Sequence, residues 1–265
     1  MNILDAISGP DASVEGTILV FDIADSTRMK EEQEEVAWLA NYAKAFEIVA
    51  RNIPASGAIV KYLGDGIMIF FGQSEQTSAV NAAIKIQEEI DSANDKNRIK
   101  CVFSCGIASG QFKKIPASDG KFDYIGQVVD RAFRLCSAAM PRAIFVDSDT
   151  IADAQASKIS SVVGFALKRT KNDYLGKEES ISLKGFSKPV PFHSIHWSSV
   201  QFGVKPSHGG RGDPVVAQMS QQPKIVESMA SQLGQFLGWH GNSGRVSSQG
   251  REFFCHKGSV VPGFA

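Results

Sequence analysis

The sequence predicts an α+β protein in which a mixed or antiparallel sheet carries helices packed on one face. Three observations predict this class: apolar runs of strand length up to residue 200, segments of helical apolar spacing between them, and hairpin turns that join neighbouring runs. Strands interleaved with helices and partly joined by hairpins are typical of α+β proteins. No internal repeat is present, so the sequence does not predict a repeat architecture.

The first two predicted elements are a buried strand and a long helix. Residues 16–23 contain a continuous apolar run, which predicts a buried strand. Residues 28–51 carry apolar side chains at helical spacing and a charged opposite face, which predicts an amphipathic helix. We expect Asp25 or Ser26 to be the N-cap of this helix, because both residue types accept hydrogen bonds from free helical N–H groups.

The remaining elements repeat this alternation of strands and helices. The other predicted strands are residues 57–62, 67–71, 100–109, 143–146, 161–169 and 180–197. The other predicted helices are residues 77–93, 127–139 and 148–156. Gly64-Asp65-Gly66 separates the first two of these strands and indicates a hairpin. We expect residues 111–125 to form an excursion around Pro116 and Gly120, and Lys184-Gly185-Phe186 to be a turn.

Composition limits the function classes. The 265 residues carry no net charge, so we do not expect a nucleic-acid partner. No segment reaches the roughly 18 apolar residues of a membrane span, and the N-terminus has no signal-peptide pattern. The four cysteines form no CxxC pair, which predicts a reduced, cytoplasmic protein.

The predicted domains are an N-terminal extension (1–13), a core domain (14–199) and a C-terminal extension (200–265). Residues 201–265 hold eleven glycines, six Lys or Arg and three Asp or Glu, which is typical of a flexible or weakly folded segment. One stretch within it has helical apolar spacing: Ile225, Met229, Leu233, Phe236 and Leu237. It could pack back on its own domain, which we favour, or dock on a partner or a membrane surface.

Two aspartates are the strongest functional signal. Asp22 and Asp65 each lie where an apolar strand ends in a polar turn. A carboxylate at a buried strand end is unfavourable unless a positive group compensates it. Two such carboxylates, brought together by strand pairing, suit a hard divalent ion. The alternative is that Asp22 and Asp25 are cap and turn residues and Asp65-Gly66 is only a hairpin turn.

A third segment, residues 123–135, ends in a predicted helix that carries Asp130 and Arg134. These two residues are four apart and therefore share one helix face. A planar guanidinium in this place suits a phosphate group. The alternative is an ordinary ion pair on the helix surface.

These three segments resemble the catalytic domain of the class III nucleotidyl cyclases, and the resemblance covers residues 14–197. It implies a cyclase fold that acts as a homodimer and converts a nucleoside triphosphate into a 3′,5′-cyclic nucleotide and pyrophosphate. It also implies two divalent cations, Mg²⁺ or Mn²⁺, held by Asp22, Asp65 and the backbone carbonyl of Ile23. One chain would supply the aspartates of a site and the other chain its arginine.

The resemblance assigns further roles within that site. The turn Asp25, Ser26 and Thr27 would bind phosphate at a helix N-terminus. Arg134 would stabilise charge on the transferring phosphate. Asp130 stands where the family usually has asparagine, and an ionised aspartate can accept but not donate a hydrogen bond to the ribose.

The base is read in the family from two positions, which match Lys61 and Asp123. In the family a Lys and Asp pair is the combination that reads adenine, so the resemblance at these two positions implies ATP as the substrate. However, we find no receiver, membrane, GAF-like or PAS-like segment before residue 14. This architecture and the segments Ile23–Thr27 and Val129–Arg134 resemble the pyrimidine cyclases of bacterial anti-phage systems. Those enzymes convert UTP or CTP into cyclic UMP or cyclic CMP, which activates a separate effector.

The favoured hypothesis is therefore a pyrimidine cyclase, and the alternative is an adenylate cyclase. A third possibility, from another class, is a degenerate cyclase domain that binds a nucleotide and signals by dimerisation. The presence of both aspartates and of Arg134 argues against it.

Overall fold

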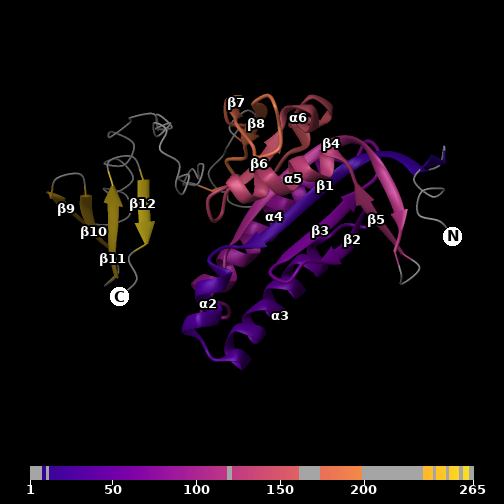
Figure 1. Ribbon diagram of the computed structural model, residues 1–265. Coiled ribbons are helices and arrows are strands. Elements are labelled where there is room, and N and C mark those ends of the chain that lie inside the picture. Colours follow the sequence, from indigo (N-terminus) through magenta and orange to yellow (C-terminus); the bar gives the residue numbers. More distant parts are fainter. Residues whose placement is uncertain are drawn as a thin grey trace. The chain divides into compact units, whose positions relative to one another are not determined.

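The computed structural model describes residues 8–9, 12–117, 121–160 and 174–198, and four strand segments between residues 235 and 262. The chain divides into two units, Met1–Lys205 and Pro206–Ala265. Each unit is described by itself (Figure 1). All residues of the candidate site lie in the first unit.

One sheet forms the centre of the first unit. Within the described residues it has eight strands in the order β2-β3-β1-β4-β6-β8-β7, with β5 paired to β4. The β4–β6 pair is parallel and the other pairs are antiparallel. The strands are β1 (Ser13–Ile23), β2 (Gly57–Tyr62), β3 (Gly66–Phe71), β4 (Phe103–Pro116), β5 (Phe122–Ile125), β6 (Ile144–Asp147), β7 (Glu179–Ile181) and β8 (Val190–Ser194). The predicted α+β class with a mixed, mostly antiparallel sheet is confirmed.

Five α-helices and one short 3₁₀ helix accompany this sheet in the described part of the unit. They are α2 (Ser26–Glu32), α3 (Glu35–Asn52), α4 (Gln76–Asp95), α5 (Gln127–Ala138), α6 (Ser148–Asp153) and η2 (Ala156–Lys158). The prediction of one helix over residues 28–51 is wrong, because the chain is extended at Gln33 between α2 and α3. Glutamates 31, 32, 34 and 35 surround this break, and like charges three or four residues apart destabilise a continuous helix.

The predicted side-chain cap of the first helix is absent. Asp25 occupies the N-cap position of α2, but its backbone is left-handed (φ 54°) and its side chain makes no cap hydrogen bond. Aspartate tolerates this conformation better than most residues. Ser26 is the first helical residue rather than the cap.

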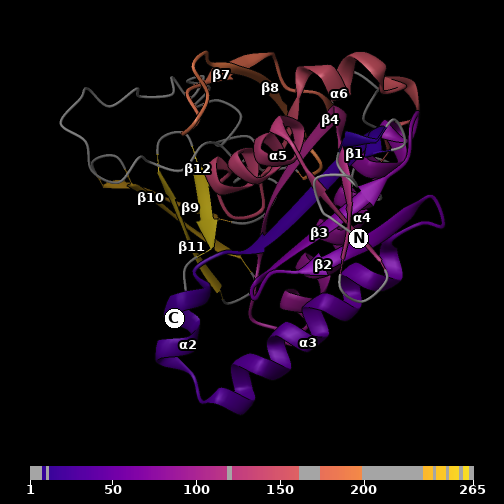
Figure 2. The same ribbon diagram turned by 45° about the vertical axis from the view of Figure 1, so that its right-hand side comes forward.

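The expectation that helices pack on one face of the sheet is also wrong. Leu19, Phe21 and Ile23 of β1 pack in one cluster with α3 and α4. Ile18 and Val20 pack in a second cluster with α5. We call these two sides of the sheet the α3–α4 face and the α5 face (Figure 2). Because successive side chains of a strand alternate, a continuous apolar run such as residues 18–21 is buried on both sides.

The excursion predicted for residues 111–125 is largely regular structure. β4 continues to Pro116, and β5 pairs back onto its last four residues. Residues 118–120 lie outside the described part. The predicted strand 161–169 also lies outside it, whereas the predicted strand 180–197 is β7 and β8 with a turn at Gly185, whose φ is 91°.

The second unit contains a four-stranded antiparallel sheet in the order β12-β11-β10-β9. Its strands are β9 (Gln235–His240), β10 (Ser243–Ser248), β11 (Arg251–His256) and β12 (Ser259–Pro262). Phe236 and Leu237 therefore lie in a strand, which contradicts the helical spacing predicted for them. Ile225, Met229 and Leu233 lie outside the described residues. None of the described helices is long and apolar enough to cross a membrane.

Helix α5 lies unusually close to β4 at Gly106. A Cβ atom built on this glycine would lie 2.2 Å from the carbonyl oxygen of Ala132 and 2.3 Å from the backbone nitrogen of Cys136. Both of these atoms belong to the backbone of α5, so no side chain can rotate away to make room. The distance between the helix and the sheet therefore depends on the absence of a side chain at residue 106.

We expect Gly106→Ala to lower the free energy of unfolding by about 1–3 kcal/mol, because the added methyl group forces α5 away from the sheet. Urea unfolding followed by circular dichroism measures this change. Gly72→Ala is the matched control, because no atom lies within 4 Å of the Cβ position there. Equal unfolding midpoints for the two variants would contradict the close approach.

Candidate functional site: a carboxylate pair, a base-side ion pair and an exposed arginine

Strand pairing brings the two predicted metal ligands to one end of the sheet. In the β1–β3 ladder Asp22 lies opposite Gly66, the residue after Asp65. The backbone N–H of Ile23 donates to the carbonyl oxygen of Asp65 at 3.0 Å, which ties the hairpin tip to the end of β1. Both aspartates are half-buried. Asp22, Ile23 and Asp65 are therefore neighbours, as their predicted roles require.

Ser26 has a contact that the sequence did not indicate. Its hydroxyl donates a hydrogen bond to the carboxylate of Asp65, and the residue is buried. This bond orients one of the two carboxylates. Asp25 and Thr27, the other two predicted phosphate-binding residues, are exposed. The phosphate-binding role of this turn stays a prediction, and the hydroxyl of Ser26 is engaged elsewhere.

The residues at this end of the sheet fit a divalent metal ion. Gly66 faces Asp22 so closely that a Cβ atom on it would lie 3.4 Å from Oδ1 of Asp22. The absence of a side chain there leaves space beside the carboxylate. Carboxylate and carbonyl oxygens are the donors that Mg²⁺ and Mn²⁺ prefer. The described residues contain no group of three or more His, Cys, Asp or Glu that could hold a metal, so the two aspartates would need a backbone carbonyl, water or substrate to complete the shell.

A β-bulge determines where Lys61 points. In the β2–β3 ladder Ile59 pairs with Ile69 and Lys61 pairs with Met68, so Val60 is an extra residue. Met68 belongs to the cluster on the α5 face, whereas Ile69 belongs to the one on the α3–α4 face. Without the extra residue, alternation would place Lys61 on the α3–α4 face. The bulge therefore turns Lys61 toward the face that carries Asp22 and α5.

On that face Lys61 meets the other predicted base-reading residue. Its Nζ lies 2.6 Å from Oδ2 of Asp123, and both side chains are partly exposed, at 36% and 26%. Oδ1 of Asp123 accepts a hydrogen bond from the backbone N–H of Tyr124. The two residues thus come from β2 and β5 and form one ion pair. Their proximity agrees with a shared role, and the role itself stays a prediction.

Aromatic packing holds β5, and with it Asp123, in place. The ring of Tyr124 stacks on Phe70 of β3 with the centroids 4.6 Å apart, and its edge meets Phe112 of β4 at 5.5 Å. Burial raises the pKa of Tyr124 above its usual value, so the phenol stays neutral at physiological pH. This packing fixes a strand of only four residues beside the site.

Asp130 and Arg134 are both exposed on α5. No ion pair joins them within the described residues, so the simple helix-surface pair that the sequence allowed is not formed. The side chain of Arg134 makes no hydrogen bond or ion pair with any described residue. Its neighbour Arg131 instead binds Asp147 and Asp149, a contact that sequence analysis missed because the partners lie 16 and 18 residues away.

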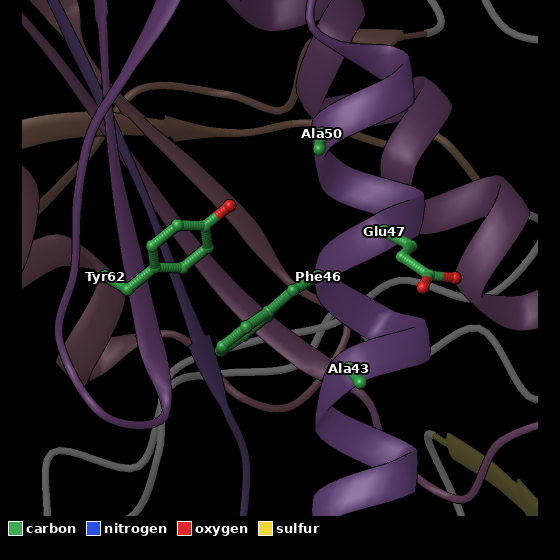
Figure 3. A pocket seen from close by; sticks show the side chains of 5 residues that line it. All are labelled: Ala43, Phe46, Glu47, Ala50 and Tyr62. Atoms are coloured by element: carbon green, nitrogen blue, oxygen red, sulfur yellow. The ribbon is translucent and has the colours of Figure 1, made fainter.

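A groove lies beside the hairpin on the α3–α4 face. It is lined by Ala43, Phe46, Glu47, Ala50 and Tyr62. Figure 3 shows the rings of Phe46 and Tyr62 turned toward each other, and Glu47 turned away from them. The ring centroids lie 5.3 Å apart, which anchors the hairpin to α3. The contact between Phe46 and Tyr62 therefore supports the hairpin that carries Asp65, and Glu47 is the one charged residue among the five that line the groove.

The chain matches one protein family over more than half of its length. The model of the adenylate and guanylate cyclase catalytic domain matches residues 11–184. An adenylate cyclase of Anabaena cylindrica is 34% identical over 91 residues, which cover 32% of this chain. The match spans only 17% of the length of that curated relative.

Solved structures of similar fold come from the same group of proteins. An adenylyl cyclase of P. aeruginosa has a TM-score of 0.56 at 23% identity, over 69% of this chain and 94% of that one. The guanylate cyclase domain of a Catenaria anguillulae protein, solved with GTP, has a TM-score of 0.54 at 16% identity, over 69% and 97%. A Trypanosoma brucei adenylate cyclase has 0.58 at 15%, over 74% and 96%. At these identities the likeness shows the fold alone.

The carboxylate pair leads to a prediction about metal binding. We expect Asp22→Asn and Asp65→Asn each to weaken Mn²⁺ binding by at least about 10-fold, since even residues that only orient metal ligands are worth 10–100-fold. Electron paramagnetic resonance of a Mn²⁺ titration measures free and bound metal directly. Neither variant should lose stability, because each removes a like charge from the metal-free site.

Asp123→Asn is the control for this titration, because Asp123 binds Lys61 and not the strand end. It should bind Mn²⁺ as the wild-type protein does. Wild-type affinity in both strand-end variants would contradict the two-aspartate site.

Proposed function

Because the chain belongs to the family of adenylate and guanylate cyclase catalytic domains, we propose that it is a metal-dependent nucleotidyl cyclase. It would convert a nucleoside triphosphate into a 3′,5′-cyclic nucleotide and pyrophosphate. The observation that carries this proposal is the meeting of Asp22 and Asp65 at one end of β1, on the face that also carries α5 and Arg134. A degenerate domain that only binds nucleotide would not need both aspartates and the arginine.

The reaction forms one bond and breaks one. The ribose 3′-oxygen attacks the α-phosphorus, the hydroxyl proton passes to solvent or to a substrate oxygen, and the bond to the bridging oxygen breaks to release pyrophosphate. Two divalent cations, Mg²⁺ or Mn²⁺, would lower the pKa of that hydroxyl and neutralise the triphosphate. Asp22, Asp65 and the carbonyl of Ile23 would hold them.

The protein side chains would bind and orient the substrate around this reaction. Arg134 would donate hydrogen bonds to the oxygens of the transferring phosphate, where negative charge accumulates. Asp130 would accept a hydrogen bond from a ribose hydroxyl, because an ionised carboxylate has no proton to donate. Both residues are exposed on one face of α5, as a contact with a substrate requires.

We further propose that the site is shared between two copies of the chain. In a homodimer, Asp22 and Asp65 of one protomer would face Arg134 of its partner. The single chain supports this arrangement, because the side chain of Arg134 makes no hydrogen bond or ion pair with any described residue of its own protomer. Each dimer would contain two such composite sites.

For the base we propose a pyrimidine, so that UTP or CTP yields cyclic UMP or cyclic CMP. Lys61 can donate to a pyrimidine carbonyl, and Asp123 can accept from the N3–H of uracil or the amino group of cytosine. Both side chains are partly exposed, at 36% and 26%, so each can exchange its present partner for a base. The product would act as a second messenger for a separate effector, as in the anti-phage systems that the α5 segment resembles.

One observation favours adenylate cyclase as the second candidate. Lys61 and Asp123 do meet, and a lysine with an aspartate is the combination that reads adenine in this family. The curated relative from Anabaena cylindrica is named an adenylate cyclase. The two candidates differ only in the base, so one competition experiment separates them.

We expect UTP or CTP to be converted at least about 10-fold faster than ATP or GTP when all four compete in the presence of Mn²⁺. Mass spectrometry of the products identifies the cyclic nucleotide. Lys61→Met and Asp123→Asn should reduce this preference, whereas Lys85→Met on the exposed side of α4 should not. A strong preference for ATP that both site variants abolish would establish the adenylate cyclase instead.

The shared site predicts recovery of activity when two inactive variants are mixed. Asp65→Ala and Arg134→Ala should each be inactive alone. After subunit exchange about half of the dimers are mixed, and each mixed dimer has one intact site, so about a quarter of wild-type activity should return. A mixture of Asp65→Ala with Asp22→Ala should recover nothing, because both changes damage the same half of the site. No recovery in the first mixture, despite demonstrated exchange, would contradict the composite site.

A further inference from the structure

Helix α5 packs on the sheet through one apolar face. Its buried residues are Val128, Val129, Ala132, Leu135 and Cys136. Apolar contacts are not directional. This buried face also makes a polar contact with β4, from Sγ of Cys136 to the carbonyl oxygen of Ser104 at 3.3 Å. A polar contact outside this buried face would help to hold the exposed side of the helix at one angle.

Arg131 supplies such a contact. Its Nη1 lies 2.7 Å from Oδ2 of Asp147 and 2.6 Å from Oδ2 of Asp149, so one nitrogen bridges two carboxylates. The Arg131 side chain is 20% exposed, the Asp147 side chain is fully buried and that of Asp149 is 68% exposed. The contact between Arg131 and Asp147 is therefore protected from solvent, and salt screens a buried ion pair less than an exposed one.

Asp147 is itself fixed by a buried hydrogen-bond network. Its Oδ1 accepts from the backbone N–H of Thr150 at 3.0 Å and from the hydroxyl of the same residue. That hydroxyl also lies 2.8 Å from Oγ of Ser109 on β4, and Ser109 meets Thr17 of β1 at 2.7 Å. All four residues are buried. Arg131 is thus joined, through Asp147, to two central strands of the sheet.

We propose that Arg131 is a positioning residue that sets the rotation of α5 and thereby the place of Arg134 in the cyclase site. The proposal rests on the function proposed above. Residues three apart on a helix lie about 60° from each other around its axis. A rotation of α5 that follows the loss of the Arg131 contact therefore moves Arg134 directly. The base-side pair lies on β2 and β5, which Arg131 does not touch.

Because Arg131 belongs to α5 and does not contact the base-side pair, we expect its loss to change kcat much more than KM. Arg131→Met should lower kcat by about 10- to 100-fold, because a displacement of about 1 Å in a catalytic group has effects of this size. KM should stay within about 3-fold of the wild type, because Lys61 and Asp123 keep their places. Arg131→Lys should recover most of kcat, since a lysine nitrogen can replace the single bridging nitrogen.

The single variant leaves the buried carboxylate of Asp147 without its cation, so it could lose stability for that reason alone. The double variant Arg131→Met with Asp147→Ser removes this difficulty. Serine is neutral and can still cap α6. We expect this protein to unfold near the wild-type midpoint and to keep the low kcat. Hydrogen exchange of the α5 amides should be faster than in the wild type.

Arg142→Gln is the matched control. It breaks the partly buried ion pair between Arg142 and Asp91, in which the side chains are 26% and 20% exposed, without touching α5. It should lower stability and leave kcat unchanged. A stable double variant with wild-type kcat overturns the proposal. A wild-type protein that cyclises none of the four nucleotides overturns the proposed function, and with it any role of Arg131 in catalysis.

Discussion

The two ladders of β1 are the constraint on which the rest of the structure depends. This strand is hydrogen-bonded to β3 on one edge and to β4 on the other, over most of its length. Because side chains alternate along a strand, one register places Ile18, Val20 and Asp22 on the α5 face together. A slip of one residue would turn Asp22 toward α3 and α4 and exchange the apolar side chains of the two faces. The register that packs the core therefore also determines the direction of the Asp22 side chain.

The site is assembled from local departures from this regular sheet. Gly66 leaves space beside Asp22, the extra residue Val60 turns Lys61 to the α5 face, and Gly106 lets α5 approach β4. None of these features strengthens the sheet, and a bulge interrupts a ladder. The large apolar clusters on both faces provide the stability that tolerates them. The candidate site is therefore formed by irregular positions in a sheet whose core packs regularly.

Much of the sheet and of the carboxylate site could be predicted from the sequence, because both depend on local patterns. Strand-length apolar runs and the Gly64-Asp65-Gly66 turn act within a few residues. The predictions failed where the deciding interaction is remote or electrostatic. The break at Gln33 follows from glutamate repulsion, the bulge at Val60 depends on the register with β3, and the partners of Arg131 follow it by 16 and 18 residues. The continuous apolar run at residues 18–21 does indicate that both faces of the sheet are covered, but this inference requires knowing that the strand is central in the sheet.

In the free protein, the two proposed base-reading residues, Lys61 and Asp123, already bind each other. A base therefore exchanges one contact for another instead of filling an unused site. The preference of the site for one base then depends on the free energy of the contacts with that base minus the free energy of the ion pair that the base replaces. Salt weakens such a partly exposed pair, and it also weakens the hold of cations on a triphosphate. A higher ionic strength would therefore favour binding of the base and weaken binding of the phosphates. The two ends of one substrate would respond to salt in opposite directions.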